Sequence, residues 1–178
     1  MITLPTSKVP ATSTNPKFLI LYGRPKCGKT SALAQLDDNL IIDLEGGSTF
    51  IDAMAVQARS VSDLGEIAQA IRAKNTEVGH NFYRHITIDN ATRLEEICLS
   101  YAAILYKKTP VGKKWEGTDV KTLPNGAGYL YIRQAVRKVI DMFRELCDEF
   151  ILVGHVKDIQ IEQNGEELSQ MALDLVGK

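Results

Sequence analysis

Cysteine is scarce in this 178-residue sequence, and long apolar runs are missing. The three cysteines, Cys27, Cys98 and Cys147, lie far apart and without the spacing of a metal site. This usage argues against a disulfide scaffold and favours a reducing, cytoplasmic setting. No stretch approaches the roughly 18 apolar residues of a membrane span, and the N-terminus lacks the apolar core of a signal peptide. We therefore expect a cytoplasmic protein that has no membrane partner.

A surplus of one charge sign is also missing. The formal net charge is −1, so no global basic field indicates nucleic acid, and any surface for it must be local. With 44% hydrophobic and 24% charged residues, the composition is that of an ordinary globular protein. The length is sufficient for one domain with its own core.

Apolar segments alternate with amphipathic ones along most of the chain. Residues 1–16 mix Thr, Ser and Pro and are expected to form a flexible leader. From residue 17 to 178 the alternation predicts an α/β fold, a mainly parallel twisted sheet flanked by helices. Strands are expected at 17–22, 40–44, 84–89 and 149–154, with a shorter one near 54–59. Helices are expected near 29–36, 62–74, 91–106 and 128–148.

Two local signals refine this outline. Ser62 is a candidate N-cap for the second helix, because its hydroxyl can accept a hydrogen bond from the first helical turn. Near the C-terminus, polar and apolar residues alternate on both sides of Asn164-Gly165, the dipeptide most typical of a tight β-hairpin. We therefore expect a C-terminal hairpin.

One segment departs from the compact pattern. Residues 107–128 contain five lysines against two acids, with one Trp, four Gly and two Pro. Such a composition predicts a long mobile loop that cannot contribute to the core.

The stretch GRPKCGKT, residues 23–30, fits the phosphate-binding pattern G-x-x-x-x-G-K-[ST]. Glycines let backbone N–H groups point at phosphates, Lys29 supplies a compact positive charge, and the Thr30 hydroxyl can ligate Mg²⁺. An apolar strand precedes the stretch and a helix-forming sequence follows it, which is the setting that the motif requires. The predicted nucleotide-binding residues are Gly23, Arg24, Pro25, Lys26, Cys27, Gly28, Lys29, Thr30 and Ser31.

Acidic residues close two of the expected strands. Asp89 ends the strand HITID and is a candidate for the Mg²⁺-associated carboxylate; alternatively it caps the next helix. Asp43 and Glu45 end the strand before two glycines, where ligands of open parallel sheets bind. Glu45 is the preferred candidate to deprotonate the attacking water, because Asp43 lies deeper in the strand.

His155 follows the apolar strand at 149–154. An imidazole there can hydrogen-bond a γ-phosphate and change position when that phosphate departs. A surface or core histidine of no catalytic role is the alternative.

Taken in order, these motifs resemble the RecA-like branch of P-loop ATPases, and the stretch LVGHVK, residues 152–157, is similar to the corresponding element of bacterial RadA-type proteins. More narrowly, the chain resembles small phage-encoded ATPases of the Sak group, which are RecA-core proteins associated with single-strand annealing and recombination. The resemblance implies that the His155 strand lies between the phosphate-loop and Asp89 strands. It further implies catalytic roles for Lys29, Glu45 and His155, and metal roles for Thr30 and Asp89.

The resemblance also implies ATP and Mg²⁺ as cofactors, single-stranded DNA as a partner, self-association into a ring or filament, and contact with a single-strand-binding protein. A phage-encoded chain would act in the host cytoplasm. In RecA-type proteins, mobile loops that follow the metal-associated β-strand contact single-stranded DNA. Residues 107–128 occupy the corresponding place in this chain. The candidate DNA-binding residues are Lys107, Lys108, Lys113, Lys114, Trp115 and Lys121. The alternative is a lysine-rich loop that only keeps the protein soluble.

Two other function classes stay open from the residues alone. A small-molecule or nucleotide kinase shares the phosphate loop, although it usually needs an Arg-rich lid, and 107–128 has no arginine. The second class is an interaction module that binds a nucleotide but does not hydrolyse it. DNA-stimulated ATP hydrolysis is the preferred prediction.

Overall fold

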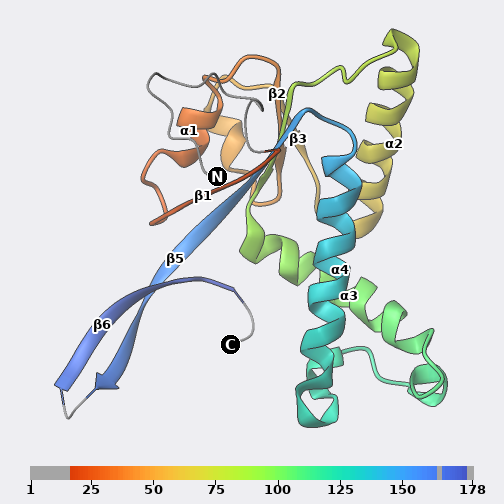
Figure 1. Cartoon of the computed structure of the whole chain (residues 1–178), viewed down its shortest axis with the longest axis vertical. Helices are drawn as coiled ribbons and strands as arrows, with labels where there is room; N and C mark the ends of the chain where they lie inside the picture. Colours follow the sequence, from red (N-terminus) through yellow and green to blue (C-terminus); the bar gives the residue numbers. More distant parts are fainter. Residues whose placement is uncertain (1–16, 164–165, 176–178) are drawn as a thin grey trace, which may run out of the picture.

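A twisted sheet forms the centre of the computed structural model, which describes residues 17–163 and 166–175 (Figure 1). Five strands run parallel in the order β1-β5-β4-β2-β3, and β6 pairs antiparallel with β5. The strands are β1 (Phe18–Gly23), β2 (Asn39–Asp43), β3 (Ala55–Gln57), β4 (His85–Asp89), β5 (Glu149–Gln163) and β6 (Glu166–Leu173). The α/β prediction is confirmed, and the His155 strand, β5, lies between β1 and β4 as the family resemblance implies.

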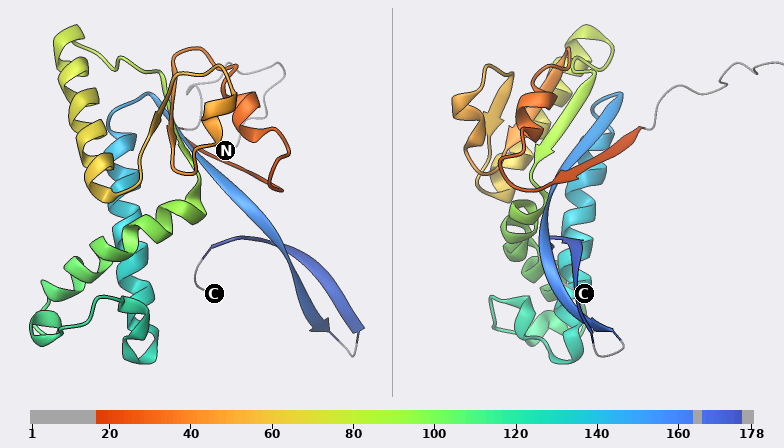
Figure 2. Two further views of the ribbon diagram at one scale, coloured as in Figure 1. Left: turned by 180° about the vertical axis from the view of Figure 1, so that it is seen from behind. Right: turned by 90° about the vertical axis from the view of Figure 1, so that its left-hand side faces the viewer.

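Helices cover both faces of the sheet (Figure 2). They are α1 (Lys29–Leu33), α2 (Val61–Val78), α3 (Ala91–Lys107) and α4 (Ala127–Arg144). Four 3-10 turns are also present: η1 (Gly47–Phe50), η2 (Gly112–Lys114), η3 (Val120–Thr122) and η4 (Pro124–Gly126). Within the described residues, none of these helices is long and apolar enough to span a membrane.

Alternate residues of the central strands enter two separate cores. On one face, Ile42 and Ile88 pack with α2, α3 and α4; on the other, Ile41 and Val153 pack with Leu33 of α1. All five residues of β2 and all five of β4 are buried, as expected for parallel strands that are covered on both faces. The sheet therefore holds its central strand ends in fixed positions.

Several helix ends differ from the sequence-based prediction. Helix α2 ends at Val78 rather than near residue 74, and α4 ends at Arg144 rather than near residue 148. Helix α1 ends at Leu33 rather than near residue 36, and the Leu33 carbonyl oxygen accepts from the Asn39 side-chain amide at 2.9 Å and from the backbone N–H of Leu36 at 3.2 Å.

Helix α2 begins after Ser60, not Ser62, so the predicted N-cap is wrong. Ser60 accepts from the backbone N–H of Asp63 while the Asp63 carboxylate accepts from the backbone of Ser60, a reciprocal capping box.

The C-terminal hairpin is confirmed by the pairing of β5 with β6. The register runs from Val156 opposite Leu173 to Gln163 opposite Glu166. The predicted turn at residues 164–165 lies outside the described residues, as does the predicted leader at 1–16. Because β5 continues well past the sheet, the hairpin projects from it as an arm (Figures 1 and 2).

The prediction that residues 107–128 contribute nothing to the core is wrong. Val120 and Leu123 are 0% and 6% exposed and belong to the main core. Gly128 permits this contact, because a Cβ atom there would lie 1.8 Å from the Val120 carbonyl oxygen. Trp115 is only partly exposed, with its ring centroid 5.2 Å from that of Tyr106. Val120, Leu123 and Trp115 thus anchor this segment, although its lysines are typical of a solvated loop.

We predict that Leu123→Ala lowers the free energy of unfolding by about 2–5 kcal/mol, because it leaves a cavity in the main core. The matched control is Val111→Ala in the same segment, where an 80% exposed side chain should change stability by no more than about 0.5 kcal/mol. Urea unfolding of both variants measures the difference. Equal stabilities would contradict the packing of this segment.

Candidate nucleotide site

The carboxyl ends of four parallel strands lie side by side at one end of the sheet. Gly23 of β1 lies opposite His155 of β5, and Asp43 of β2 lies opposite Asp89 of β4. A cavity of about 310 Å³ opens at these strand ends. Its lining residues are Lys26, Gly28, Lys29, Thr30, Ser31, Asp43, Glu45, Gly47, Ile51, Asp89 and His155. The register of the sheet thus brings together the residues that were predicted from separate motifs.

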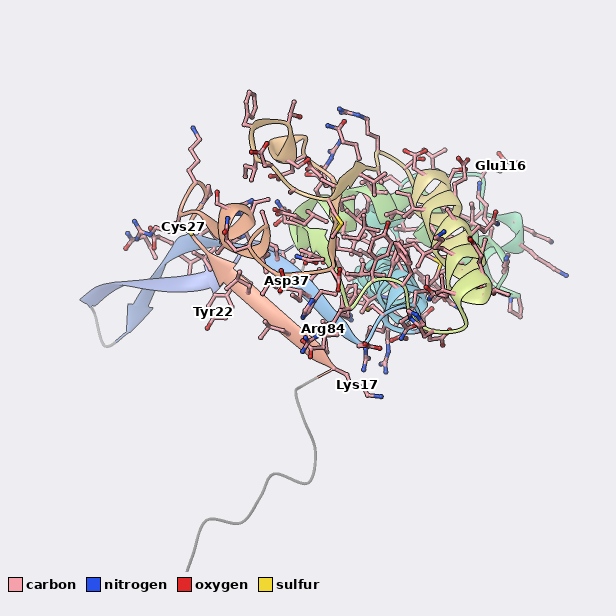
Figure 3. The ribbon with its side chains drawn as sticks, turned by 90° about the horizontal axis from the view of Figure 1, so that it is seen from above. Lys17, Tyr22, Cys27, Asp37, Arg84 and Glu116 are labelled. Carbon is pink, nitrogen blue, oxygen red and sulfur yellow. The ribbon has the colours of Figure 1, made fainter. Side chains whose placement is uncertain are left out.

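The loop between β1 and α1 has the form expected of a phosphate-binding loop. Gly28 has φ 85°, a left-handed conformation that favours glycine, and it directly precedes the first turn of α1. Gly23 lies so close to Cys27 that a Cβ atom would be 3.1 Å from its Sγ atom. Figure 3 shows Cys27 on this loop, near the end of β1 that carries Tyr22.

Not every loop side chain faces the cavity. Arg24 forms an ion pair with Asp158 on the β5–β6 arm, with an N–O distance of 3.2 Å and both side chains more than half exposed. Its guanidinium therefore links the loop to the arm, whereas the sequence had placed it among the nucleotide-binding residues.

Lys29 is buried and ties the loop to the neighbouring strand. Its Nζ atom donates to the carbonyl oxygens of Gly23 at 3.1 Å and Arg24 at 2.9 Å. The same atom lies 3.2 Å from Nδ1 of His155. An ammonium can only donate, so Nδ1 accepts, and we assign the ring proton to Nε2.

The other side of the His155 ring faces Glu45. Nε2 of His155 lies 3.5 Å from Oε2 of Glu45, so the imidazole bridges the phosphate-loop lysine and the candidate base. The Glu45 side chain is 49% exposed, which leaves its carboxylate open to water.

Thr30 and Asp89, the two residues predicted to hold a metal ion, contact each other. The Thr30 hydroxyl donates to Oδ2 of Asp89 at 2.6 Å. Burial raises the pKa of the Asp89 carboxyl, and the nearby carboxylates of Glu45 and Asp43 raise it further, against the lowering effect of the Thr30 bond. A divalent cation at this position would offset that unfavourable charge, so the donor set fits Mg²⁺ held together with phosphate oxygens.

Asp43 has a different role from Glu45. Its Oδ1 atom accepts from the backbone N–H groups of Glu45 and Gly46, and its Oδ2 atom from both N–H and hydroxyl of Ser48, at 2.5–2.9 Å. Burial raises the pKa of Asp43, but these four hydrogen bonds outweigh it and hold the pKa below its usual value. With both oxygens engaged, Asp43 fixes the loop that carries Glu45.

The candidate DNA-binding lysines lie elsewhere. Lys107, Lys108, Lys113, Lys114 and Lys121 are all exposed. None lines the nucleotide cavity. Figure 3 shows Glu116, which belongs to the same segment, at the other end of the molecule from Cys27. Trp115, which was also a candidate, is only partly exposed: its ring packs edge-on against Tyr106, and the Lys107 ammonium lies 5.4 Å from its centroid.

Sequence reasoning missed three features of the site. It did not identify the anchoring role of Asp43, the contact of Ser48 with it, or the place of Ile51 in the cavity wall. The signal for the first two was the short polar stretch after the strand, in which an Asp precedes a Gly-Gly-Ser turn.

Comparison with protein families supports this geometry. A family model described as AAA domain (AAA_24) matches residues 15–178, and the chain belongs to this family of P-loop NTPases. No curated protein matches the chain. The chain is accordingly an ATP-binding and ATP-hydrolysing protein, and membership of the family implies Mg²⁺ with the nucleotide.

We predict that Asp43→Asn lowers the free energy of unfolding by about 1–3 kcal/mol at neutral pH, because an amide cannot accept all four hydrogen bonds. A carboxyl whose pKa is lowered by folding contributes its stability above the pKa of the unfolded chain, about 3.9, and loses it as pH falls further. The difference in free energy of unfolding between parent and variant should therefore become smaller at acidic pH. Denaturant unfolding from neutral pH downward measures this difference, and a difference that stays constant would contradict the assignment.

Proposed function

We propose that Glu45 is the general base of ATP hydrolysis in this chain and that the hydrolysis serves work on single-stranded DNA. The observation that carries the first part is the chain of contacts from Lys29 through His155 to Glu45. The second part is supported by the resemblance to the Sak group and by the exposed lysines of the α3–α4 connection.

In this proposal, the cavity binds the triphosphate against the loop, with Lys29 releasing its carbonyl partners to contact phosphate oxygens. Glu45 accepts a proton from water while that water attacks the γ-phosphorus. The bond to the bridging oxygen breaks, which yields ADP and inorganic phosphate. Asp43 is unsuited to this step, because its oxygens are already engaged.

Thr30 and Asp89 would hold Mg²⁺, which would supply positive charge to offset the negative charge of the phosphate oxygens. His155 connects the two halves of the site. When Lys29 turns toward phosphate, Nδ1 of the imidazole loses its donor, and the tautomer that carries the ring proton on Nδ1 can then donate to a γ-phosphate oxygen. The same ring contacts Glu45, so the state of the phosphate is relayed to the base.

For DNA, we propose that the five exposed lysines that run from the end of α3 to η3 contact DNA phosphates in recombination, annealing or replication. Trp115 is assigned to packing rather than to base stacking. The segment is anchored through Val120 and Leu123, so its lysines are presented on an ordered surface. Self-association and contact with a single-strand-binding protein belong to the same proposal.

We predict that Glu45→Gln keeps ATP affinity but slows hydrolysis by about 10²–10⁴-fold, the usual contribution of a general base. Lys29→Ala is the comparison variant, which should lose both binding and hydrolysis because it removes the phosphate-facing cation. Equilibrium nucleotide binding and phosphate release are measured on each. Near-normal turnover in folded Glu45→Gln would refute the assignment, and near-normal turnover in Lys29→Ala would refute the site.

We also predict that replacing Lys113 and Lys114 with Ala weakens binding to single-stranded oligonucleotides and flattens its salt dependence by about 1.4, at about 0.7 per phosphate contact. The matched control replaces Lys17 and Lys138, two exposed lysines before β1 and on α4. Affinities are measured across a salt series. If both double variants bind as the parent does, the α3–α4 connection is not the DNA surface.

A further inference from the structure

One lysine of the phosphate loop has a backbone conformation that lysine rarely adopts. Lys26 has φ 62°, which lies in the left-handed region. Among the described residues other than glycine, Asp38 and Asn125 are the two others with a positive φ, and both belong to residue types that tolerate it. Lysine has a Cβ atom and no short polar side chain that could bond the local backbone, so this conformation is unfavourable for its residue type.

This unfavourable conformation occurs at the site of hydrolysis, because Lys26 lines the nucleotide cavity together with Lys29 and Glu45. The backbone of the loop does not itself require a lysine. Glycine or asparagine adopts a left-handed conformation more readily and would still direct backbone N–H groups toward a phosphate. Residues in unfavourable conformations cluster at functional sites. The side chain, rather than the backbone, therefore accounts for a lysine at position 26.

The three cations of the loop differ in their partners. Arg24 is ion-paired with Asp158 of the β5–β6 arm at 3.2 Å. Lys29 is buried, and its Nζ atom donates to two carbonyl oxygens of the loop. Lys26 is exposed, and the part of the chain that the structure describes gives its ammonium no hydrogen bond or ion pair. Lys26 therefore keeps its positive charge available for a ligand.

The cavity has a surplus of negative side chains. The carboxylates of Asp43, Glu45 and Asp89 line it, against two lysines among the described residues, Lys26 and Lys29. A bound triphosphate adds further negative charge. A second ammonium that contacts the phosphates would offset this charge, and the flexible four-carbon stem of a lysine lets its ammonium fold over the cavity.

We propose that Lys26 is a catalytic residue of ATP hydrolysis and that its ammonium contacts the oxygen that bridges the β- and γ-phosphates. The inference rests on the proposed function, since it concerns the same reaction. In that mechanism Glu45 lies on the side of the attacking water. Lys26 belongs to the loop that holds the phosphates, so we assign it to the side of the leaving group, in line with the attack.

The role of the ammonium follows from the movement of charge during the reaction. The water oxygen forms a bond to the γ-phosphorus while Glu45 accepts the proton of that water. The bond from the γ-phosphorus to the bridging oxygen breaks, and its electron pair stays on that oxygen as a negative charge of ADP. Lys26 keeps its own protons and donates a hydrogen bond to this oxygen, so it stabilises charge that is present mainly in the transition state.

The second cation comes from the same chain as the rest of the site. Lys26 and Lys29 are separated by two residues of one loop. The chemical step therefore needs no cation from a second copy, whatever assembly the chain forms.

Steady-state ATP hydrolysis by variants of the full chain tests the proposal, with and without a single-stranded oligonucleotide. Lys26→Asn fits the backbone but lacks the charge, so kcat should fall about 100-fold while KM changes little, at the lower end of the cost of losing one charge-stabilising donor. Lys26→Arg keeps the charge and should recover most of the rate. Lys138→Asn removes an exposed lysine of α4 outside the cavity and should hydrolyse ATP as the parent does.

Urea unfolding shows that a lost rate is not a lost fold. Lys26→Asn should unfold at a urea concentration no lower than that of the parent, because asparagine tolerates the left-handed conformation better.

A mixture of two variants tests whether Lys26 acts within its own chain. Lys29→Ala keeps Lys26 but lacks the cation that binds ATP, whereas Lys26→Asn keeps the rest of the site. The mixture should hydrolyse ATP no faster than the sum of the two variants measured alone, at every protein concentration. A rate that recovers on mixing would overturn the assignment, since Lys26 would then serve the site of a neighbour.

Three other results would also overturn the proposal: a parent-like kcat in Lys26→Asn, a higher KM with unchanged kcat, or a Lys26→Arg variant as slow as Lys26→Asn. Glu45→Gln in the same assay separates this inference from the proposed function. Slow hydrolysis by Glu45→Gln with normal hydrolysis by Lys26→Asn would contradict the role of Lys26 alone. Normal hydrolysis by both would contradict the proposed function as well.

Discussion

The parallel register of four strands is the constraint on which the site depends. Gly23, His155, Asp89 and Asp43 come from distant parts of the chain, and pairing of β1, β5, β4 and β2 brings their strand ends to one edge. Both faces of the central strands are buried, so a shift of one residue would expose the apolar side chains of two cores. The hydrophobic core thereby fixes the positions of polar groups that contribute little to it.

The carboxylates of Asp43, at the end of β2, and Glu45, just after it, have different environments. Asp43 accepts four hydrogen bonds and orders the loop, while Glu45 stays half exposed and reaches His155. The environment of each group decides its role: a carboxylate with all its acceptor sites engaged is a poor proton acceptor, and one open to water is a good one. In the proposed mechanism, hydrolysis rests on Glu45 and loop order on Asp43, and separate substitutions can distinguish the two.

Local patterns in the sequence predicted the phosphate loop and the strand ends well, because glycine spacing and apolar runs report local geometry directly. They predicted less where the outcome depends on distant contacts. The hydrogen bonds of Asp43 come mostly from backbone N–H groups, which have no residue signature. Val120 and Leu123 are isolated among lysines, so their burial against α4 gives no periodic signal.

The relay through His155 is the central claim, and single-turnover hydrolysis combined with nucleotide affinity tests it most directly. His155→Gln keeps one accepting and one donating atom, whereas His155→Ala keeps neither. The account predicts that turnover falls in the order parent, Gln, Ala while ATP affinity stays nearly unchanged. A large loss of affinity with normal turnover would contradict it, since His155 would then contact the bound nucleotide without acting on hydrolysis.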